Sequence, residues 1–176
     1  MELRTRRART DDLDGVMSVL ESALPPNLRG DATDYRIRIE KLGENFIVGE
    51  LGGEVVGYVS SMIMPDRPTV DELEMLFDSE GVESAADFHQ GGNYDGATKC
   101  FYLGVIAVKE GRRNNGYGTA LLEETKRLAR SKSFDRIHLI TTKEKEPYFM
   151  KRGATAIDDS FTPYFGVPHR WYEMRV

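Results

Sequence analysis

The segment from Val108 to Leu122 constrains the fold more than any other part of the chain, because it joins an apolar run to an amphipathic helix through a glycine-rich basic turn. Before the turn, Phe101 to Val108 is rich in aromatic and β-branched residues, which predicts a largely buried strand. After it, apolar and small residues recur at helical spacing and predict a helix with one face on a core. These residues are Leu121, Leu122, Thr125, Leu128 and Ala129.

The turn itself favours a bound anion. Gly116 and Gly118 have no side chains, so the backbone can adopt positive φ and a ligand can approach its amides at the helix start. The helix dipole, together with Arg112 and Arg113, favours negative charge at the same place. The alternative is a flexible connection with solvated charges. Phosphate binding is favoured because strand, turn and helix occur together.

Two familiar phosphate motifs fail at a required position. A Walker A loop, and with it a P-loop nucleotide hydrolase, needs Lys where Tyr117 stands, and a dinucleotide fingerprint that begins at Gly116 needs Gly or Ala where Leu121 stands. What remains is Arg113-x-x-Gly116-x-Gly118 directly after a strand. This pattern resembles the acetyl-CoA signature of the GNAT superfamily, the acyl-CoA-dependent N-acyltransferases.

The order of the expected elements resembles that family as well. Strands are expected at 2–8, 46–51, 54–64, 101–108 and 136–141, with a terminal pair around 163–168. Helices are expected from Asp11 to the stop at Pro25, at 33–42, after the glycine turn, and at 144–152, with Gly153 as a C-cap. The resemblance implies an α/β (α+β) fold: a mixed, mostly antiparallel central sheet of about six to seven strands, flanked by helices on both faces.

Composition favours one domain over the whole chain, residues 1–176. The chain has 176 residues and 40% hydrophobic content, enough for one packed core. It contains no apolar run of membrane-spanning length, and its first residues, Met-Glu-Leu-Arg, are not typical of a signal peptide. The single cysteine, Cys100, fits a reducing compartment and a buried strand position. The expectation is a soluble cytoplasmic protein without a membrane partner.

Charge and histidine spacing exclude two further classes. With 24 basic and 29 acidic residues, the net charge of −5 argues against nucleic-acid binding through a basic surface. His89, His138 and His169 lie far apart in the sequence, so a metal site has no support. An acidic surface is compatible with a cationic amine acceptor.

An insertion at about 65–99 has no clear counterpart in the resembling family. It begins with a capping box, Thr69 and Glu72, ahead of a short helix, and a second helix at 83–90 and a glycine-rich loop at 91–96 are expected to follow. One hypothesis is that the insertion provides acids for a positively charged substrate, the alternative being a solvated cap or a dimer contact. The acids considered are Glu72, Glu74, Asp78 and Asp87.

The resemblance implies acetyl-CoA as co-substrate and no metal. In the family, the cofactor strand pairs with the pantetheine and a strand N–H stabilises the developing oxyanion, which points to Ile106, Ala107 and Val108 here. The turn and the helix start would bind the pyrophosphate through backbone amides. Those residues are Arg113, Asn114, Asn115, Gly116, Tyr117, Gly118 and Thr119.

The candidate base follows from the chemistry of the acceptor. An ammonium with an unperturbed pKa of about 10.4 must lose a proton before it attacks. The family often places a carboxylate on a central strand, but the strand that ends at Val108 has none. The candidates left are His138, favoured by its pKa, Glu144, and the acids of the insertion. The alternative for His138 is a hydrogen-bonded strand histidine.

The candidate acid follows from the resemblance. The family places a tyrosine four residues before the glycine that ends the short helix, but Phe149 holds that position here and Tyr148 stands one residue earlier, about 100° away on the helix. Pro147 fixes the helix start near Tyr148, so a shift of one residue would restore the aim of Tyr148 as general acid. The alternative is that both rings only pack against the sheet.

The implied reaction is transfer of an acetyl group from acetyl-CoA to a primary amine, by direct attack through a tetrahedral intermediate. The acceptor is a small molecule or a peptide. The alternative function is a non-catalytic acyl-CoA-binding sensor or structural domain, which needs the same loop. Members of the family commonly form dimers, so a homodimer stays open.

Overall fold

The computed structural model describes residues 2–64, 67–75 and 100–176, and it places eight strands in one sheet. The strand order is β1-β2-β3-β4-β5-β8-β6, with β7 paired to β8. Every pairing is antiparallel except that of β4 with β5, which is parallel. The strands are β1 (Arg4–Arg7), β2 (Phe46–Leu51), β3 (Glu54–Met64), β4 (Cys100–Val108), β5 (Arg136–Thr142), β6 (Ala154–Ala156), β7 (Thr162–Tyr164) and β8 (Val167–Arg175).

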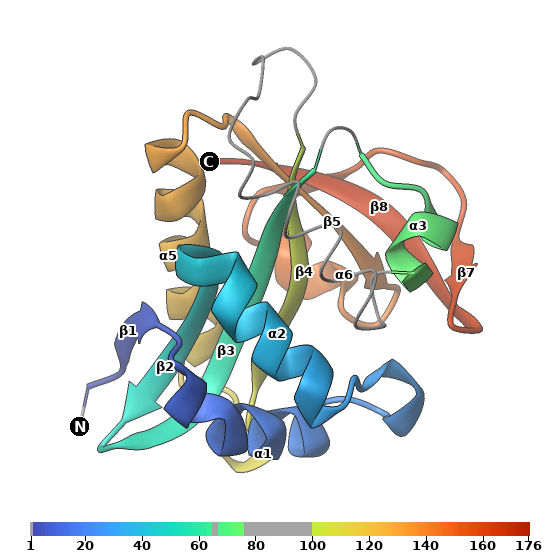
Figure 1. Cartoon of the computed structure of the whole chain (residues 1–176). Helices are drawn as coiled ribbons and strands as arrows, with labels where there is room; N and C mark the ends of the chain where they lie inside the picture. Colours follow the sequence, from blue (N-terminus) through green and yellow to red (C-terminus); the bar gives the residue numbers. More distant parts are fainter. Residues whose placement is uncertain (1, 65–66, 76–99) are drawn as a thin grey trace.

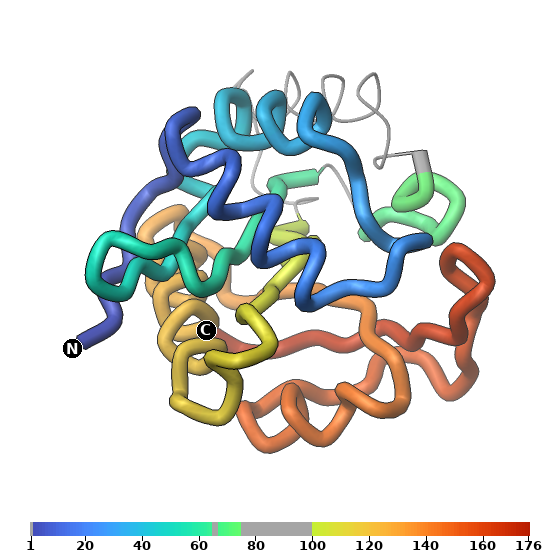
Figure 2. The backbone as a smooth tube through the Cα atoms, turned by 90° about the horizontal axis from the view of Figure 1, so that it is seen from below, coloured from blue at the N-terminus to red at the C-terminus, as the bar shows by residue number. Residues whose placement is uncertain are grey.

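Helices cover both faces of this sheet. The helices α1 and α2 lie on one face, and α5 and α6 lie on the other (Figures 1 and 2). The described helices are α1 (Leu13–Ala23), α2 (Ala32–Leu42), α3 (Val70–Met75), α5 (Tyr117–Ser131) and α6 (Glu146–Met150). Short 3₁₀ turns occur at Thr10–Asp12, Pro26–Leu28, Gly43–Asn45 and Glu110–Arg112. The expected fold class is confirmed, with eight strands instead of six to seven.

Most expected boundaries hold to within a residue or two, and the exceptions have physical causes. The helix expected from Asp11 begins at Leu13, because the residues before it form a separate 3₁₀ turn, Thr10–Asp12. The Asp12 carboxylate closes that turn by accepting the Arg9 N–H (2.7 Å). The helix expected at 144–152 begins only at Glu146, where Pro147 occupies the first turn. Strand β6 was not predicted, since three residues are too few for a pattern.

The capping box of α3 is confirmed. The backbone N–H of Thr69 donates to the Glu72 carboxylate (2.7 Å), and the N–H of Glu72 donates to Thr69 Oγ1 (3.2 Å). The rest of the insertion, with the expected helix at 83–90, the loop at 91–96, Asp78 and Asp87, lies outside the described residues. None of the helices in the described ranges is long and apolar enough to cross a membrane.

Strands β4 and β5 are joined by very little ladder pairing. They share a single bridge pair, Tyr102 with His138. Two residues later the register of β4 against β3 shifts, because Ser60 faces Val105 and Ser61 faces Leu103, which leaves Gly104 as the bulged residue. The edge of β4 from Gly104 to Val108 that faces β5 therefore has no ladder partner in β5. We call this unpaired stretch of strand edge the strand gap.

Two glycines bring α5 close to the sheet. Gly49 on β2 and Gly57 on β3 face each other across the ladder, and Leu121 of α5 packs over both. A Cβ on Gly57 would stand 2.9 Å from the Ala107 carbonyl oxygen and 3.1 Å from Leu121 Cδ1. Leu121 is fully buried in the core beneath α5. The two glycines thus determine how closely α5, the helix that follows the basic turn, packs on the sheet.

Candidate active site

The basic turn between β4 and α5 presents backbone amides. After the 3₁₀ turn the chain takes positive φ at Asn114 (64°) and Gly116 (81°), and Gly116 is the N-cap of α5. No side chain of the described residues caps this helix, and its first intrahelical bond runs from the Ala120 N–H to the Gly116 carbonyl (3.0 Å). The N–H groups of Tyr117, Gly118 and Thr119 precede that bond. Uncapped amides at the positive end of a 15-residue helix suit an anion.

The polar side chains of the turn hold its shape. Arg113 donates to the carbonyl oxygens of Val108 and Ala23, both at 3.3 Å. Asn115 Nδ2 donates to the carbonyl of Arg113 (2.9 Å). Because these side chains fold back on the chain, the backbone remains as the surface that a phosphate would meet.

The ten residues expected to bind the cofactor form two adjoining stretches. Ile106, Ala107 and Val108 end β4 along the strand gap, and 113–119 form the turn and the first turn of α5. Ile106 and Val108 pack toward the core beneath α5, whereas Ala107 packs into the core beneath α1 and α2. The structure therefore brings the strand edge and the amides together.

The short helix α6 aims Tyr148, not Phe149, at this turn. Phe149 is buried in the core beneath α5. The Tyr148 hydroxyl lies 3.0 Å from the point that a Cβ on Gly118 would occupy, so it reaches the start of α5. The hydroxyl is buried and makes no hydrogen bond of normal geometry within the described part of the chain. Burial raises the pKa of Tyr148, and the positive charge of Arg152 opposes that rise.

Arg152 connects the start of α5 to the short helix α6. The sequence patterns did not identify this residue. It donates from Nη2 to Thr119 Oγ1 (2.7 Å) and from Nη1 to the Tyr148 carbonyl (2.7 Å). Its guanidinium carbon lies 3.8 Å from the centroid of the Tyr148 ring. A signal was available, since Arg152 stands four residues after Tyr148 at the end of the same helical segment.

His138 lies on the other face of the sheet. Its neighbours Ile137 and Leu139 pack beneath α5, so strand alternation turns His138 toward the face of α1 and α2. Its Nδ1 is buried without a hydrogen-bond partner among the described residues, and burial lowers the pKa of the imidazole. The ring is therefore neutral near pH 7. Glu144, the alternative base, stands exposed in the turn after β5, outside α6.

A cavity opens on the face of α1 and α2, beside the bulge of β4. Its volume is about 20 Å³, and it is lined by Arg38, Met62, Leu73, Tyr102, Gly104, Val105 and Tyr164. The ring of His169 packs edge-on against Tyr164, with centroids 5.2 Å apart. His169 Nδ1 lies 2.7 Å from the Val167 carbonyl and must donate to it, which leaves Nε2 as the acceptor nitrogen. Sequence spacing alone did not single out His169. We call this space the Arg38 cavity.

No group of three or more His, Cys, Asp or Glu side chains that could hold a metal occurs in the described ranges. An amide-lined turn lies on the α5 side of β4, and a small, mostly apolar cavity that includes Arg38 lies on the side of α1 and α2. Tyr148 lies on the α5 face and His138 on the opposite face.

Comparisons with known proteins show which family and which fold the chain resembles. The model of the Acetyltransferase (GNAT) family matches residues 14–148. An N-alpha-acetyltransferase from Sulfurisphaera tokodaii is 32% identical over 125 residues, which are 69% of this chain and 59% of that protein. The chain thus spans about three fifths of the length of this relative.

Two solved structures share the fold. The loading GNATL domain of CurA from Lyngbya majuscula superposes with a TM-score of 0.73 at 15% identity, covering 99% of this chain and 98% of that one. Ard1 from Thermoplasma volcanium superposes with a TM-score of 0.69 at 14% identity, covering 100% and 99%. At these identities the likeness concerns the fold alone.

Proposed function

Because the chain belongs to the Acetyltransferase (GNAT) family, we propose that it transfers an acetyl group from acetyl-CoA to a primary amine by direct attack through a tetrahedral intermediate. The observation that carries this proposal is the uncapped start of α5 beside the strand gap. The amides of 117–119 have the position and polarity to hold a pyrophosphate, and the free edge of β4 has backbone groups for the pantetheine amides. The relative named N-alpha-acetyltransferase supports peptide N-termini as one class of acceptor to test.

The two faces of the sheet suggest a division of roles. An N–H of the strand from Ile106 to Val108 would stabilise the oxyanion in the gap. His138, neutral because burial lowers its pKa, would take the proton of the amine on the face of α1 and α2. Tyr148, kept protonated by burial, would give a proton to the departing thiolate on the α5 face. Glu144 is an alternative base. Because it is exposed, it is less suited than His138 to take the proton of the amine.

The test begins with binding. Acetyl-CoA should raise the melting temperature in a concentration-dependent way, because a ligand that binds only the native state stabilises it by mass action. Free thiol should then appear when amines are added. No shift at millimolar acetyl-CoA would overturn the proposal. A shift without thiol release from any acceptor in a broad amine panel would favour the non-catalytic acyl-CoA sensor instead.

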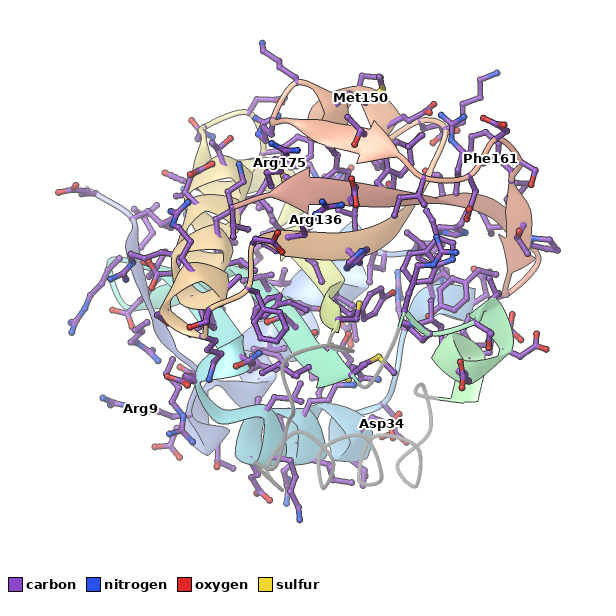
Figure 3. The ribbon with its side chains drawn as sticks, turned by 90° about the horizontal axis from the view of Figure 1, so that it is seen from above. Arg9, Asp34, Arg136, Met150, Phe161 and Arg175 are labelled. Atoms are coloured by element: carbon purple, nitrogen blue, oxygen red, sulfur yellow. The ribbon has the colours of Figure 1, made fainter. Side chains whose placement is uncertain are left out.

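Removing the hydroxyl of Tyr148 should slow turnover without weakening cofactor binding. We expect Tyr148→Phe to lower kcat roughly 10- to 100-fold, the scale of a lost general acid, with an unchanged Kd for acetyl-CoA. Thiol release and calorimetric titration would measure the two constants. The matched control is Met150→Ala, since Met150 is exposed on the same helix (Figure 3). Full turnover of Tyr148→Phe would remove Tyr148 as the acid.

A further inference from the structure

Arg152, at the end of α6, is bonded to α5 at two points. Its Nη2 and Nε both donate to Thr119 Oγ1, at 2.7 and 3.2 Å, and its carbonyl accepts a hydrogen bond from Lys126 Nζ at 3.2 Å. Thr119 and Lys126 lie about two turns apart on one face of α5. Arg152 therefore has a fixed position relative to the helix whose first amides form the candidate phosphate site.

Tyr148 is in turn held to Arg152 at two points. Arg152 Nη1 donates to the Tyr148 carbonyl at 2.7 Å, and the guanidinium carbon lies 3.8 Å from the centroid of the Tyr148 ring. A cation over the face of a phenol ring is attracted by the π electrons of that ring. The guanidinium therefore restricts both the main chain and the side chain of Tyr148.

The other contacts of α6 hold the helix more than they aim the Tyr148 ring. A helix of five residues is not stable by itself, and its first turn is anchored by Glu146, whose carboxylate accepts from Arg170 and Tyr172. The buried ring of Phe149 packs edge-on against that of Tyr148, with centroids 5.0 Å apart. Apolar packing has little directionality, whereas the hydrogen bonds from the guanidinium to α5 and α6 are directional.

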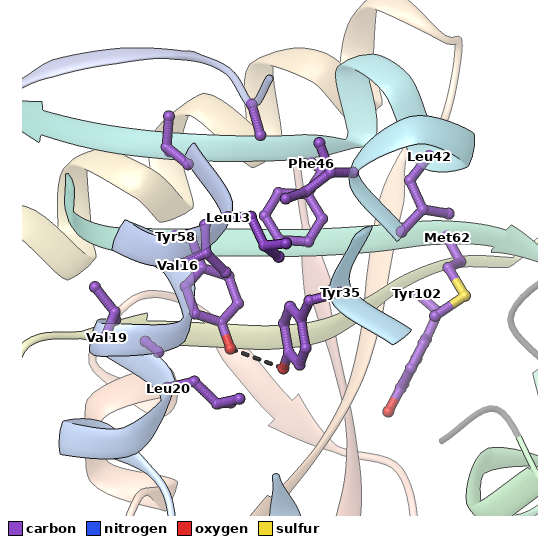
Figure 4. Packing of buried hydrophobic residues seen from close by; sticks show 14 of the residues in the cluster. Leu13, Val16, Val19, Leu20, Tyr35, Leu42, Phe46, Tyr58, Met62 and Tyr102 are labelled. Atoms are coloured by element: carbon purple, nitrogen blue, oxygen red, sulfur yellow. Dashed lines mark hydrogen bonds between the residues drawn. The ribbon is translucent and has the colours of Figure 1, made fainter. Parts of the chain in front are cut away.

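Tyrosines in the core beneath α1 and α2 are held in a different way. The hydroxyls of Tyr35 and Tyr58 bond to each other at 2.9 Å (Figure 4), so both hydroxyls serve the packing of that core. Tyr148 is held through its ring and its carbonyl, and its hydroxyl makes no hydrogen bond of normal geometry within the described ranges. Its hydroxyl is thus available as a donor at the start of α5.

The contacts of Arg152 suit a residue that holds the site rather than one that binds the substrate. Each of its three side-chain nitrogens already donates to Thr119 or to the Tyr148 carbonyl. Its positive charge also opposes the rise that burial causes in the pKa of Tyr148, which makes the phenol a better proton donor.

Resting on the proposed role of Tyr148 as general acid, we propose that Arg152 is the positioning residue for this acid, and that it holds the Tyr148 hydroxyl in the direction in which it meets the bound cofactor. Arg152 itself neither binds acetyl-CoA nor transfers a proton. The planar guanidinium suits this task, because it bonds two helices at once while its face covers the ring.

The experiment is a double-mutant cycle on kcat between Arg152→Met and Tyr148→Phe, assayed by thiol release with the amine of the panel that reacts fastest. Because Arg152 acts through Tyr148, we expect Arg152→Met to lower kcat roughly tenfold in the wild-type background and by less than about threefold in the Tyr148→Phe background. A larger further loss in Tyr148→Phe would contradict the proposal, since a general loss of packing acts in both backgrounds. So would a loss of less than about threefold in the wild-type background.

Binding of acetyl-CoA separates positioning from cofactor binding. The fully buried Leu121 and Leu122 anchor α5 without Arg152, so we expect the Kd of Arg152→Met for acetyl-CoA to stay within about fivefold of the wild type. A greater loss of affinity would place Arg152 in the cofactor site instead.

Arg152→Lys separates geometry from charge, because it keeps the positive charge and replaces the planar fork with a single ammonium. We expect its kcat to remain more than about threefold below that of the wild type, and a smaller difference would show that charge alone suffices. If Arg152→Met does not fold, Arg152→Lys takes its place in the cycle. Lys151→Met is the matched control, since Lys151 is an exposed cation directly before Arg152, and it should keep the wild-type kcat.

The outcomes also distinguish this proposal from the one on which it rests. A wild type that binds acetyl-CoA and releases thiol, but shows no coupling between the two substitutions, removes only the role of Arg152. Full turnover by Tyr148→Phe removes the acid and the role of Arg152 together. The absence of any thermal shift with acetyl-CoA removes the acetyltransferase itself.

Discussion

Gly118→Val is expected to lose at least roughly 100-fold in acetyl-CoA affinity while the protein stays folded. A Cβ at Gly118 would stand 3.0 Å from the Tyr148 hydroxyl and 3.7 Å from Val108 Cγ2. A branched side chain there would push Tyr148 aside and shield the amides at the start of α5. The helix itself should tolerate the change, because valine has a better helix propensity than glycine. Isothermal titration with acetyl-CoA would measure the loss.

Gly111→Ala is the control for this variant. Gly111 lies in the same turn, but a Cβ there would meet no atom of residues 2–64, 67–75 or 100–176 within 4 Å. We expect its Kd for acetyl-CoA and its melting temperature to match those of the wild type. If Gly118→Val bound acetyl-CoA within about threefold of the wild type, α5 would not begin at the pyrophosphate site.

Gly57→Ala is expected to destabilise the fold by about 2 kcal/mol, within the usual range for an overpacked core. The new Cβ would stand 2.9 Å from the Ala107 carbonyl oxygen, a backbone atom that cannot move without displacing β4. It would also press on Leu121, which is fully buried. Urea unfolding followed by circular dichroism would measure the change in the free energy of unfolding.

Gly49→Ala offers a close comparison, because Gly49 faces Gly57 across the β2–β3 ladder. Its Cβ would meet the end of the Leu3 side chain at 3.2 Å and Leu121 Cδ2 at 3.6 Å. A leucine near the N-terminus can rotate away, so we expect a change of less than about 1 kcal/mol. Equal destabilisation by both variants would show that the contact between a Cβ at Gly57 and the Ala107 carbonyl of β4 is not what destabilises Gly57→Ala.

The parts of the site that depend on local sequence could be predicted. The buried strand, the two glycines and the amphipathic helix follow one another directly in the sequence, so local patterns were enough to predict them. The residues from Val108 to Leu122 form the expected strand end, turn and helix. The capping box at Thr69 and Glu72 is equally local and is confirmed. The direction of Tyr148 also followed from a local constraint, since Pro147 fixes the first turn of α6.

The strand gap and the Arg38 cavity could not be predicted in the same way. Gly104 was visible as a glycine within a strand, but the bulge depends on its pairing with Ser60 and Ser61, which are more than 40 residues away in the chain. Arg38 occupied an apolar position of its helix, a signal that was present and was not used. The cavity itself combines residues from α2, α3, β3, β4 and β7, and no local pattern relates such distant segments.

The single bridge pair between β4 and β5 also bears on how the chain folds. It divides the sheet into two antiparallel halves, β1 to β4 and β5 to β8, each of which pairs its own strands. Helix α5 contacts strands of both halves and packs on them through one continuous apolar stripe. Each half pairs most of its strands without the other, and α5 is a described helix that packs on both, so we expect it to couple their stability. Amide hydrogen exchange would then report two cooperative units whose opening is coupled through that helix.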